Sequence, residues 1–488
     1  MLTQYQTPYF DAMIKYVEDK TLPFHTPGHK QGKGCTEKFR KFVGEEVLKL
    51  DLDIDDIENY EKVLEEAQLF TAQAYGADKS FFLVNGTTSG IHVMILSVCS
   101  SGDEIIVPRN AHKSIISGVI LAGAVPVFIP SEMDEELHIP YNVTPEDVEE
   151  AIKKHPQAKA VIIVNPTYYG LTTDIEKIAQ ITHHYDKLLL VDEAWGAHFK
   201  FHPLLPTSAM EAGADMCVNS THKLLSGMTQ ASMLHIKGKS INPARVKSIL
   251  SLLQTTSPSC ILRASLDCAR MQMATEGEKL LTKTIELATK VRNEVNKIPG
   301  LSCFGKELIG KPGVYDLDPT RITITVKKIG CLGYEVERIL QEQYKIKIEM
   351  SDLFNIVLII SIGDTEQDID YLLFCLRDFT SKEEINTLKT QELSKKYSPL
   401  INFLHDLPEQ VLTPHDAVFG KHKTIEFTHA SGEISAELIV PFPPGIPLLF
   451  PGERISQGII DYINLESKAG MRFNGPEAPT LKTIKVVR

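Results

Sequence analysis

Tryptophan and cysteine are scarce in this chain of 488 residues, which contains one Trp and eight Cys. The cysteines are scattered, no CxxC pair occurs, and none lies near histidines at the spacing typical of zinc sites. Scattered thiols in a chain of this size are typical of reduced intracellular proteins. We therefore expect neither a disulfide framework nor a metal site.

Long apolar runs and an excess of basic residues are also missing. No stretch approaches the roughly 20 apolar residues that span a bilayer, and the first residues, MLTQYQTPYF, lack the basic and apolar segments of a signal peptide. The chain has 51 Lys and Arg against 63 Asp and Glu, which argues against a polyanion-binding scaffold. We expect a cytoplasmic protein without a nucleic-acid or membrane partner. The acidic balance leaves open the binding of cationic small molecules.

Two nucleotide-binding motifs are absent as well. No GxGxxG follows the first strand of a βαβ unit, which excludes a Rossmann oxidoreductase, and no Walker GxxxxGK loop occurs. What the sequence does contain, from about residue 60 to 240, is an alternation of short apolar runs with stretches of helical spacing. This pattern predicts an α/β domain with a mostly parallel sheet. The expected strands are 80–84, 104–107, 125–129, 160–164, 187–191, 216–218 and 233–236, with helices at 89–100, 144–154 and 175–185.

The remainder of the chain predicts two smaller units. A long helical stretch, 265–297, leads into a second α/β segment, and a polar linker at 381–399 precedes a third unit. In the second segment we expect strands 321–326, 345–350 and 356–360 and helices 333–343 and 366–376. The expected parts are an N-terminal arm with an active-site loop (1–60), a large domain (61–297), a small α/β domain (298–380) and a C-terminal domain (400–488).

A lysine among hydroxyl groups follows the predicted strand 215–219. In Ser220-Thr-His222-Lys223, a lysine beside a phosphate site could form a Schiff base with a cofactor. The alternative is a surface lysine in a polar loop.

Two further segments favour a Schiff-base lysine over a surface lysine. Asp192 ends a strand-like run, where a carboxylate can pair with a protonated pyridine nitrogen, although it could equally cap a helix. The segment 84–90, with Gly86 and three following hydroxyl groups, suits a phosphate at a helix N-terminus, or is an ordinary capped helix start. If the strands are correct, Lys223, Asp192 and Gly86 lie at one edge of one sheet.

The lysine segment resembles the signature of the Orn/Lys/Arg decarboxylases, a pyridoxal-phosphate family with the aspartate-aminotransferase fold. The resemblance covers nearly the whole chain and is strongest to the short biosynthetic arginine decarboxylases of Gram-positive bacteria, which lack the N-terminal wing domain of longer members. It implies an α/β fold with a mostly parallel central sheet, a smaller α/β domain and a C-terminal α+β domain. Besides 220–232, the matching segments are 25–30, 86–89, 108–114, 165–170, 192–195 and 443–453.

The resemblance also implies a role for each site residue. Lys223 would carry pyridoxal 5'-phosphate, Asp192 would pair with its ring nitrogen, and His112 would stack on the ring. Lys223 or His222 would return a proton to the substrate. The other implied cofactor contacts are Gly86, Thr87, Thr88, Ser89, Ala194, Trp195, Ser220 and His222, with Thr255, Thr256 and Ser257 reaching in from a neighbouring subunit. The implied substrate contacts are Glu453, Trp195, His25 and His29. A homodimer is therefore expected, and further assembly stays open.

The implied reaction is decarboxylation of a basic amino acid, with arginine converted to agmatine for polyamine biosynthesis. Lysine and ornithine remain alternatives, because Trp195 stands where the short arginine enzymes are expected to carry His, and the loop 413–419 also departs from their pattern. An aminotransferase usually binds the α-carboxylate through an arginine, and 356–361 contains none. A catalytically dead regulatory relative would be expected to lose Lys223 or Asp192, which are both present.

Overall fold

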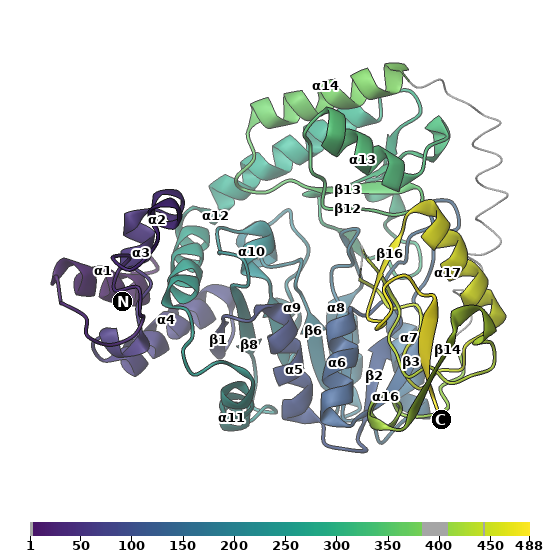
Figure 1. The fold of residues 1–488 in the computed structure, drawn as a ribbon, viewed down its shortest axis with the longest axis horizontal. Coiled ribbons are helices and arrows are strands. Elements are labelled where there is room, and N and C mark those ends of the chain that lie inside the picture. Colours follow the sequence, from purple (N-terminus) through teal and green to yellow (C-terminus); the bar gives the residue numbers. More distant parts are fainter. Residues whose placement is uncertain (1–2, 383–407, 443–444) are drawn as a thin grey trace. The chain divides into compact units, whose positions relative to one another are not determined.

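The computed structural model describes residues 3–382, 408–442 and 445–488 (Figure 1). The chain divides into two compact units, and each is described by itself. The first unit is Met1–Ser97 with Val191–Leu281, and the second is Val98–Leu190 with Thr282–Arg488. The expected linker 381–399 lies almost wholly outside the described residues. Within the described ranges, no helix has both the length and the apolar character that crossing a membrane requires.

Seven strands form one mostly parallel sheet in the order β1-β8-β7-β6-β4-β2-β3, which confirms the predicted α/β class. Strand β2 runs parallel to β3 and β4, whereas β8 runs antiparallel to both β1 and β7. The strands are β1 (Lys79–Leu83), β2 (Glu104–Pro108), β3 (Val125–Ile129), β4 (Ala160–Val164), β6 (Leu188–Asp192), β7 (Met216–Asn219) and β8 (Ser232–Ile236). All five residues of β4 and of β8 are buried, as expected for strands covered on both faces.

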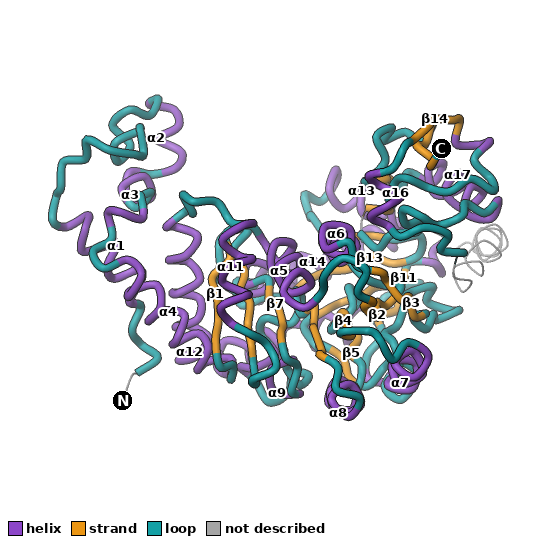
Figure 2. The backbone as a smooth tube through the Cα atoms, turned by 90° about the horizontal axis from the view of Figure 1, so that it is seen from below, coloured by secondary structure: helices purple, strands orange, loops and turns teal. Residues whose placement is uncertain are grey.

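Helices flank the strands of the first unit (Figure 2). Tyr9, Phe82 and Met233 share one apolar core with residues of the long helix α12. The helices are α1 (Pro8–Glu18), α2 (Glu37–Val43), α3 (Glu45–Lys49), α4 (Tyr60–Tyr75), α5 (Gly86–Val98), α9 (Ala209–Ala212), α10 (Thr221–Leu224), α11 (Pro243–Leu253) and α12 (Cys260–Val295), of which α12 continues into the second unit.

The second unit adds a four-stranded sheet, β12-β13-β11-β9, and two strand pairs, β14 with β17 and β15 with β16. Its helices are α6 (Lys113–Ala122), α7 (Pro145–Lys154), α8 (Ile175–His184), α13 (Gly333–Gln343), α14 (Glu366–Lys382), α16 (Pro414–Phe419) and α17 (Gln457–Ala469). Its further strands are β5 (Leu171–Thr172), β9 (Ser302–Cys303), β10 (Asp316–Leu317), β11 (Arg321–Thr325), β12 (Met350–Ser351), β13 (Asn355–Ile359), β14 (His422–Glu426), β15 (Val440–Phe442), β16 (Arg472–Asn474) and β17 (Thr483–Val487).

The predicted strand 345–350 is wrong. Only Met350–Ser351 form a strand there, β12. Lys345, two residues after the end of α13, has a left-handed backbone with a φ of +59°, so the chain turns instead of extending. The alternation of Ile346 and Ile348 with lysines reflects packing of the two isoleucines against the core of the small sheet, without strand pairing.

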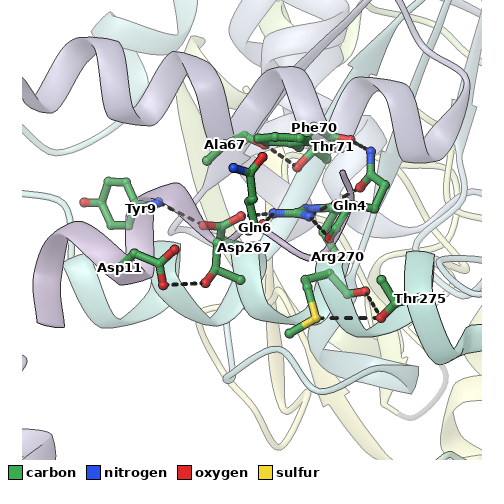
Figure 3. Close-up of polar contacts among 12 residues, drawn as sticks. Gln4, Gln6, Tyr9, Asp11, Ala67, Phe70, Thr71, Asp267, Arg270 and Thr275 are labelled. Carbon is green, nitrogen blue, oxygen red and sulfur yellow. Dashed lines mark hydrogen bonds and ion pairs between the residues drawn. The ribbon is translucent and has the colours of Figure 1, made fainter. Parts of the chain in front are cut away.

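A buried ion pair fastens the N-terminal segment to α12 (Figure 3). The side chains of Asp267 and Arg270 are both fully buried and contact each other. The guanidinium also donates to the carbonyl oxygens of Gln4, at 2.7 Å, and Gln6, at 2.6 Å, while Asp267 accepts from the backbone N–H of Tyr9 at 2.9 Å. One charge pair therefore satisfies backbone groups that no helix or strand pairs.

We predict that Arg270→Met destabilises the first unit by about 3 kcal/mol, because it leaves the Asp267 carboxylate buried without its counter-charge. Urea denaturation followed by circular dichroism measures this loss. The double variant with Asp267→Asn removes both charges and should recover part of it. A single variant as stable as the parent would contradict the assignment.

Candidate active site

Three strand ends of the first unit meet at one edge of the sheet. Strands β1 and β7 both run antiparallel to β8 and therefore share one direction. The backbone N–H of Glu193, just beyond β6, donates to the carbonyl of Val218 in β7 at 3.1 Å. The N–H of Gly86, just beyond β1, donates to Gln230 at 2.9 Å. Local strand order thus brings Asp192, Lys223 and the Gly86 turn to one edge, as the sequence predicts.

Lys223 lies on the short helix α10, which begins directly after β7. Its Nζ lies 3.8 Å from the centroid of the Trp195 ring, and Trp195 is itself buried. An ammonium group over an indole face is attracted by the negative face of the ring. The amine is therefore directed inward at the sheet edge, where a covalently bound cofactor would need it.

Asp192 is the last residue of β6 and is buried. Burial raises the pKa of its carboxyl, while the charge of Lys223 and a hydrogen bond from the N–H of Ala194, at 3.1 Å, act in the opposite direction. Lys223 is thus close enough to favour the ionised form of Asp192. A carboxylate held in this way can keep a proton on a pyridine nitrogen.

Hydroxyl groups gather at the start of α5. The Thr87 Oγ1 hydrogen-bonds the Ser220 Oγ and lies 3.1 Å from the Ser232 Oγ. The Ser89 hydroxyl donates to the carbonyl of Gly86, whose φ of +71° favours glycine, while Thr88 is exposed. Hydroxyls beside the N-terminus of a thirteen-residue helix can bind a phosphate dianion.

His222 points its Nδ1 toward the carbonyl oxygen of Ala231, at 3.1 Å. Because a carbonyl oxygen only accepts, this nitrogen carries the proton and a neutral ring has Nε2 as its acceptor. The backbone N–H of His222 also donates to Ala231, at 3.3 Å, so both contacts fix the ring in place.

The other predicted residues of the first unit lie elsewhere in it. His25 Nε2 is 2.5 Å from Asp56, and His29 Nε2 is 3.1 Å from Asp51, so both histidines pair with one acidic segment. The segment 255–257 is exposed in the connection between α11 and α12. Neither group makes a described contact with Lys223 or Asp192.

His112 belongs to the second unit and caps the N-terminus of α6. Its Nδ1 accepts from the N–H of Ser114 at 3.2 Å, which leaves Nε2 to carry the proton of a neutral ring. The ring lies beside Tyr168, with centroids 6.5 Å apart, and a Cβ on Gly445 would stand 3.4 Å from it. The capping contact thus holds the plane of the imidazole.

Glu453, also in the second unit, is buried and already paired with a positively charged side chain. Its carboxylate accepts two hydrogen bonds from Arg109, at 2.5 and 3.1 Å, and one from the N–H of Phe450, at 2.8 Å. Burial raises its pKa, and Arg109 lowers it. The guanidinium in turn lies 3.9 Å from the centroid of the Phe450 ring. The sequence indicated Glu453 but not Arg109, because the two residues are 344 positions apart.

Sequence reasoning assigned no role to Glu193, the neighbour of Asp192. Its carboxyl is buried, accepts from the N–H of Ala209 at 2.6 Å and from the Asn219 amide at 2.8 Å, and so ties the end of β6 to β7. Burial raises its pKa to about 8, although both hydrogen bonds act to lower it. Glu193 is therefore a neutral positioning residue beside a carboxylate, and the acidic pair in the sequence was the available signal.

These first-unit residues fit a pyridoxal-phosphate group. Lys223 provides the amine, and Asp192 provides a buried carboxyl group on which the charge of that amine acts. The turn at Gly86 provides hydroxyl groups that can bind the phosphate. Gly90 adds a packing requirement, since a Cβ there would stand 2.7 Å from side-chain atoms of both Leu83 and Val218. The glycine lets the helix approach the sheet closely enough to place its N-terminus at the edge.

Comparison with solved structures defines the class of fold. The lysine decarboxylase of Francisella novicida is 25% identical, with a TM-score of 0.86 over 99% of this chain and 81% of that one. The alanine–glyoxylate aminotransferase of Nostoc sp., 16% identical, superposes with a TM-score of 0.54 over 66% of this chain and 87% of that one. The fold is therefore the aspartate-aminotransferase-like fold shared by these enzymes.

Sequence comparison then gives the family. The family "Orn/Lys/Arg decarboxylase, major domain" matches residues 7–368, and its C-terminal domain matches 400–480. Arginine decarboxylases of Bacillus anthracis and Bacillus subtilis are 42% and 40% identical over all of this chain and 98% and 99% of their own lengths. The constitutive lysine decarboxylase of Escherichia coli is 26% identical over 96% of this chain and 78% of its own. The chain belongs to the Orn/Lys/Arg decarboxylase family, and it is a decarboxylase.

Glu193 generates a pH prediction. The folded protein holds its proton up to about pH 8, whereas an unfolded glutamic acid releases it near its ordinary pKa of about 4.3. Between these values the folded state binds more protons, so stability falls as pH rises, by at most about 1.4 kcal/mol per pH unit. Glu193→Gln, which has the same shape and no charge, should flatten this fall.

The measurement is the free energy of unfolding from urea titrations at several pH values between about 5 and 8. Glu276→Gln, at an exposed position of α12, is the matched control and should follow the parent protein. Equal pH slopes for parent and Glu193→Gln would show that Glu193 is ionised when folded.

Proposed function

We propose that the chain decarboxylates L-arginine to agmatine and CO₂ with pyridoxal 5'-phosphate as cofactor. The observation that carries the proposal is the cluster of Lys223, Asp192 and the Gly86 turn at one sheet edge. The substrate rests on the arginine decarboxylases that match this chain over its whole length, which are more similar to it than the lysine decarboxylases.

The chain's own residues would bind and orient the cofactor. Lys223 Nζ would attach to the aldehyde carbon, Asp192 would hold a proton at the ring nitrogen, and the hydroxyls of Thr87 and Ser220 would bind the phosphate. His112, with its ring fixed by the contact with Ser114, would cover a face of the ring. When bound, pyridoxal phosphate withdraws the electron pair that remains on Cα when a carboxylate departs.

A proton must then replace the lost carboxyl group at Cα. Lys223 Nζ could supply it, and so could His222 Nε2 when the imidazole is protonated, because the Nδ1 of His222 is engaged with Ala231. Trp195, whose ring lies against the Lys223 amine, would exclude water at this point. A water-poor surrounding also favours loss of the substrate's charged carboxylate.

An aminotransferase reaction is the alternative that the fold allows. Strand β13 contains no arginine to bind an α-carboxylate, but the adjacent strand β11 begins with the buried Arg321, which pairs in register with Ile359. The absence of arginine from β13 is therefore a weaker argument against an aminotransferase than the sequence suggested. Membership of the decarboxylase family is what favours decarboxylation.

We further propose a homodimer that serves polyamine biosynthesis. The support is that the segment 255–257 is exposed, so that a second subunit could reach it. Such an arrangement would make each site depend on two chains.

The test is to incubate the purified protein and pyridoxal phosphate with arginine, lysine or ornithine and to identify the amine by mass spectrometry. We expect agmatine from arginine as the main product. Lys223→Ala should lose the visible absorbance of the lysine-bound cofactor and reduce turnover by at least about a thousandfold, the scale for loss of a covalent catalyst. Cadaverine as the main product would refute the substrate, and an active Lys223→Ala variant would refute the site.

The pair of Arg109 and Glu453 allows a second test. If Glu453 contacts the cationic end of the substrate, Glu453→Gln should raise KM about tenfold, the effect of a lost charge-assisted contact. Arg109→Gln is the control, since it frees Glu453 without removing the carboxylate. Equal KM values for the two variants would show that Glu453 acts by holding Arg109, and cofactor content checks that neither change disturbs the lysine site.

A further inference from the structure

A partly open pocket of about 150 Å³, called the cavity below, is lined only by residues of the second unit. Its wall combines residues of four parts of the chain: Asn110 after β2, Tyr169 before β5, Tyr334 and Asp352 from the small sheet region, and Tyr462 and Glu466 on α17. A cavity of this size can enclose a group as large as a benzene ring. The reaction proposed above uses none of these residues.

Two carboxyl groups on this wall take their described hydrogen bonds from neutral donors. The Tyr169 hydroxyl donates to Asp352 at 2.8 Å, and the Tyr334 hydroxyl donates to Glu466 at 3.1 Å. Asp352 also accepts from the backbone N–H of Asn355 at 2.8 Å. Burial raises the pKa of Asp352 to about 6 and that of Glu466 to about 7. Neither carboxyl has the kind of counter-charge that Arg109 gives Glu453.

Asn110 supplies an independent observation. The residue is 4% exposed and lines the cavity, its Nδ2 donates to the carbonyl of Tyr141 at 2.9 Å, and its Oδ1 has no hydrogen-bond partner. A buried acceptor without a partner costs free energy that a bound donor would recover. The wall of the cavity thus contains a buried amide with an unpartnered oxygen, two carboxyls and three tyrosine rings.

The basic groups near the cavity are already engaged. Arg109 pairs with Glu453, and Lys327 Nζ lies 3.1 Å from Nε2 of His138. Burial and the nearby charge of Lys327 lower the pKa of His138 to about 4, so its ring is neutral near pH 7. The wall is therefore rich in acceptors and aromatic faces, which is the composition that binds cationic groups.

We propose that this cavity binds the guanidinium or ammonium group of a small organic cation, at a site built from Asp352, Glu466 and Asn110. N–H donors of the ligand would satisfy both carboxylates and the orphaned amide oxygen, and the tyrosine rings would contact its charge. The site does not depend on the reaction proposed for Lys223, and a cation held here would stabilise the contact of α17 with α13 through Tyr334.

Methylguanidine is the probe, titrated by calorimetry into the protein loaded with pyridoxal phosphate. We expect binding that Glu466→Gln weakens about tenfold, since a neutral amide replaces a carboxylate. Asp461→Asn, an exposed change on the same helix, is the matched control and should bind as the parent does. If circular dichroism shows that Glu466→Gln does not fold, Asp352→Asn is used in its place.

Two further measurements separate the cavity from the lysine site. Binding should release protons as the carboxyls ionise, so the measured heat should depend on the ionisation enthalpy of the buffer. The change in cofactor absorbance on addition of arginine should be the same in Glu466→Gln and in the parent. No binding of methylguanidine, equal binding by both variants, or a parallel loss of the arginine response would each overturn the second site. Absence of agmatine formation would instead refute the proposed reaction.

Discussion

A buried carboxylate beside a lysine amine is the interaction on which the candidate active site depends. Burial alone would neutralise both acids that end β6, because it raises the pKa of each. The charge of Lys223 acts on Asp192, whereas Glu193 receives hydrogen bonds from the neutral groups of Ala209 and Asn219. A nearby cation therefore opposes burial at Asp192 but not at Glu193, so Glu193 holds the strand end while Asp192 is the acid electrostatically coupled to the lysine.

Much of this edge could be predicted from the sequence, because local pattern determines it. Continuous apolar runs identified the strands, and parallel strands place the residues after them at one edge. The same reasoning failed at 345–350, where alternating isoleucines and lysines resembled a strand. Burial of Ile346 and Ile348 produces that alternation, and the left-handed backbone at Lys345 cannot be read from periodicity.

Other features that the sequence could not predict join distant segments. Glu453 carried a family motif, but its partner Arg109 is 344 positions away, and the hydrogen bonds between them leave the carboxylate engaged. The buried side chain of Asn110 donates through its nitrogen to Tyr141, 31 positions away, while its oxygen has no hydrogen-bond partner. Such contacts result from tertiary packing, which no spacing of residue types records.

The acids of the second unit fall into two kinds, and this bears on how a cation is recognised. Glu453 is balanced by Arg109, so a cationic substrate would have to compete with a guanidinium held by two hydrogen bonds and by Phe450. Asp352 and Glu466 have neutral donors, so a cation could bind them without displacing a charge. Asp352 and Glu466 therefore gain more than Glu453 from a bound guanidinium or ammonium group.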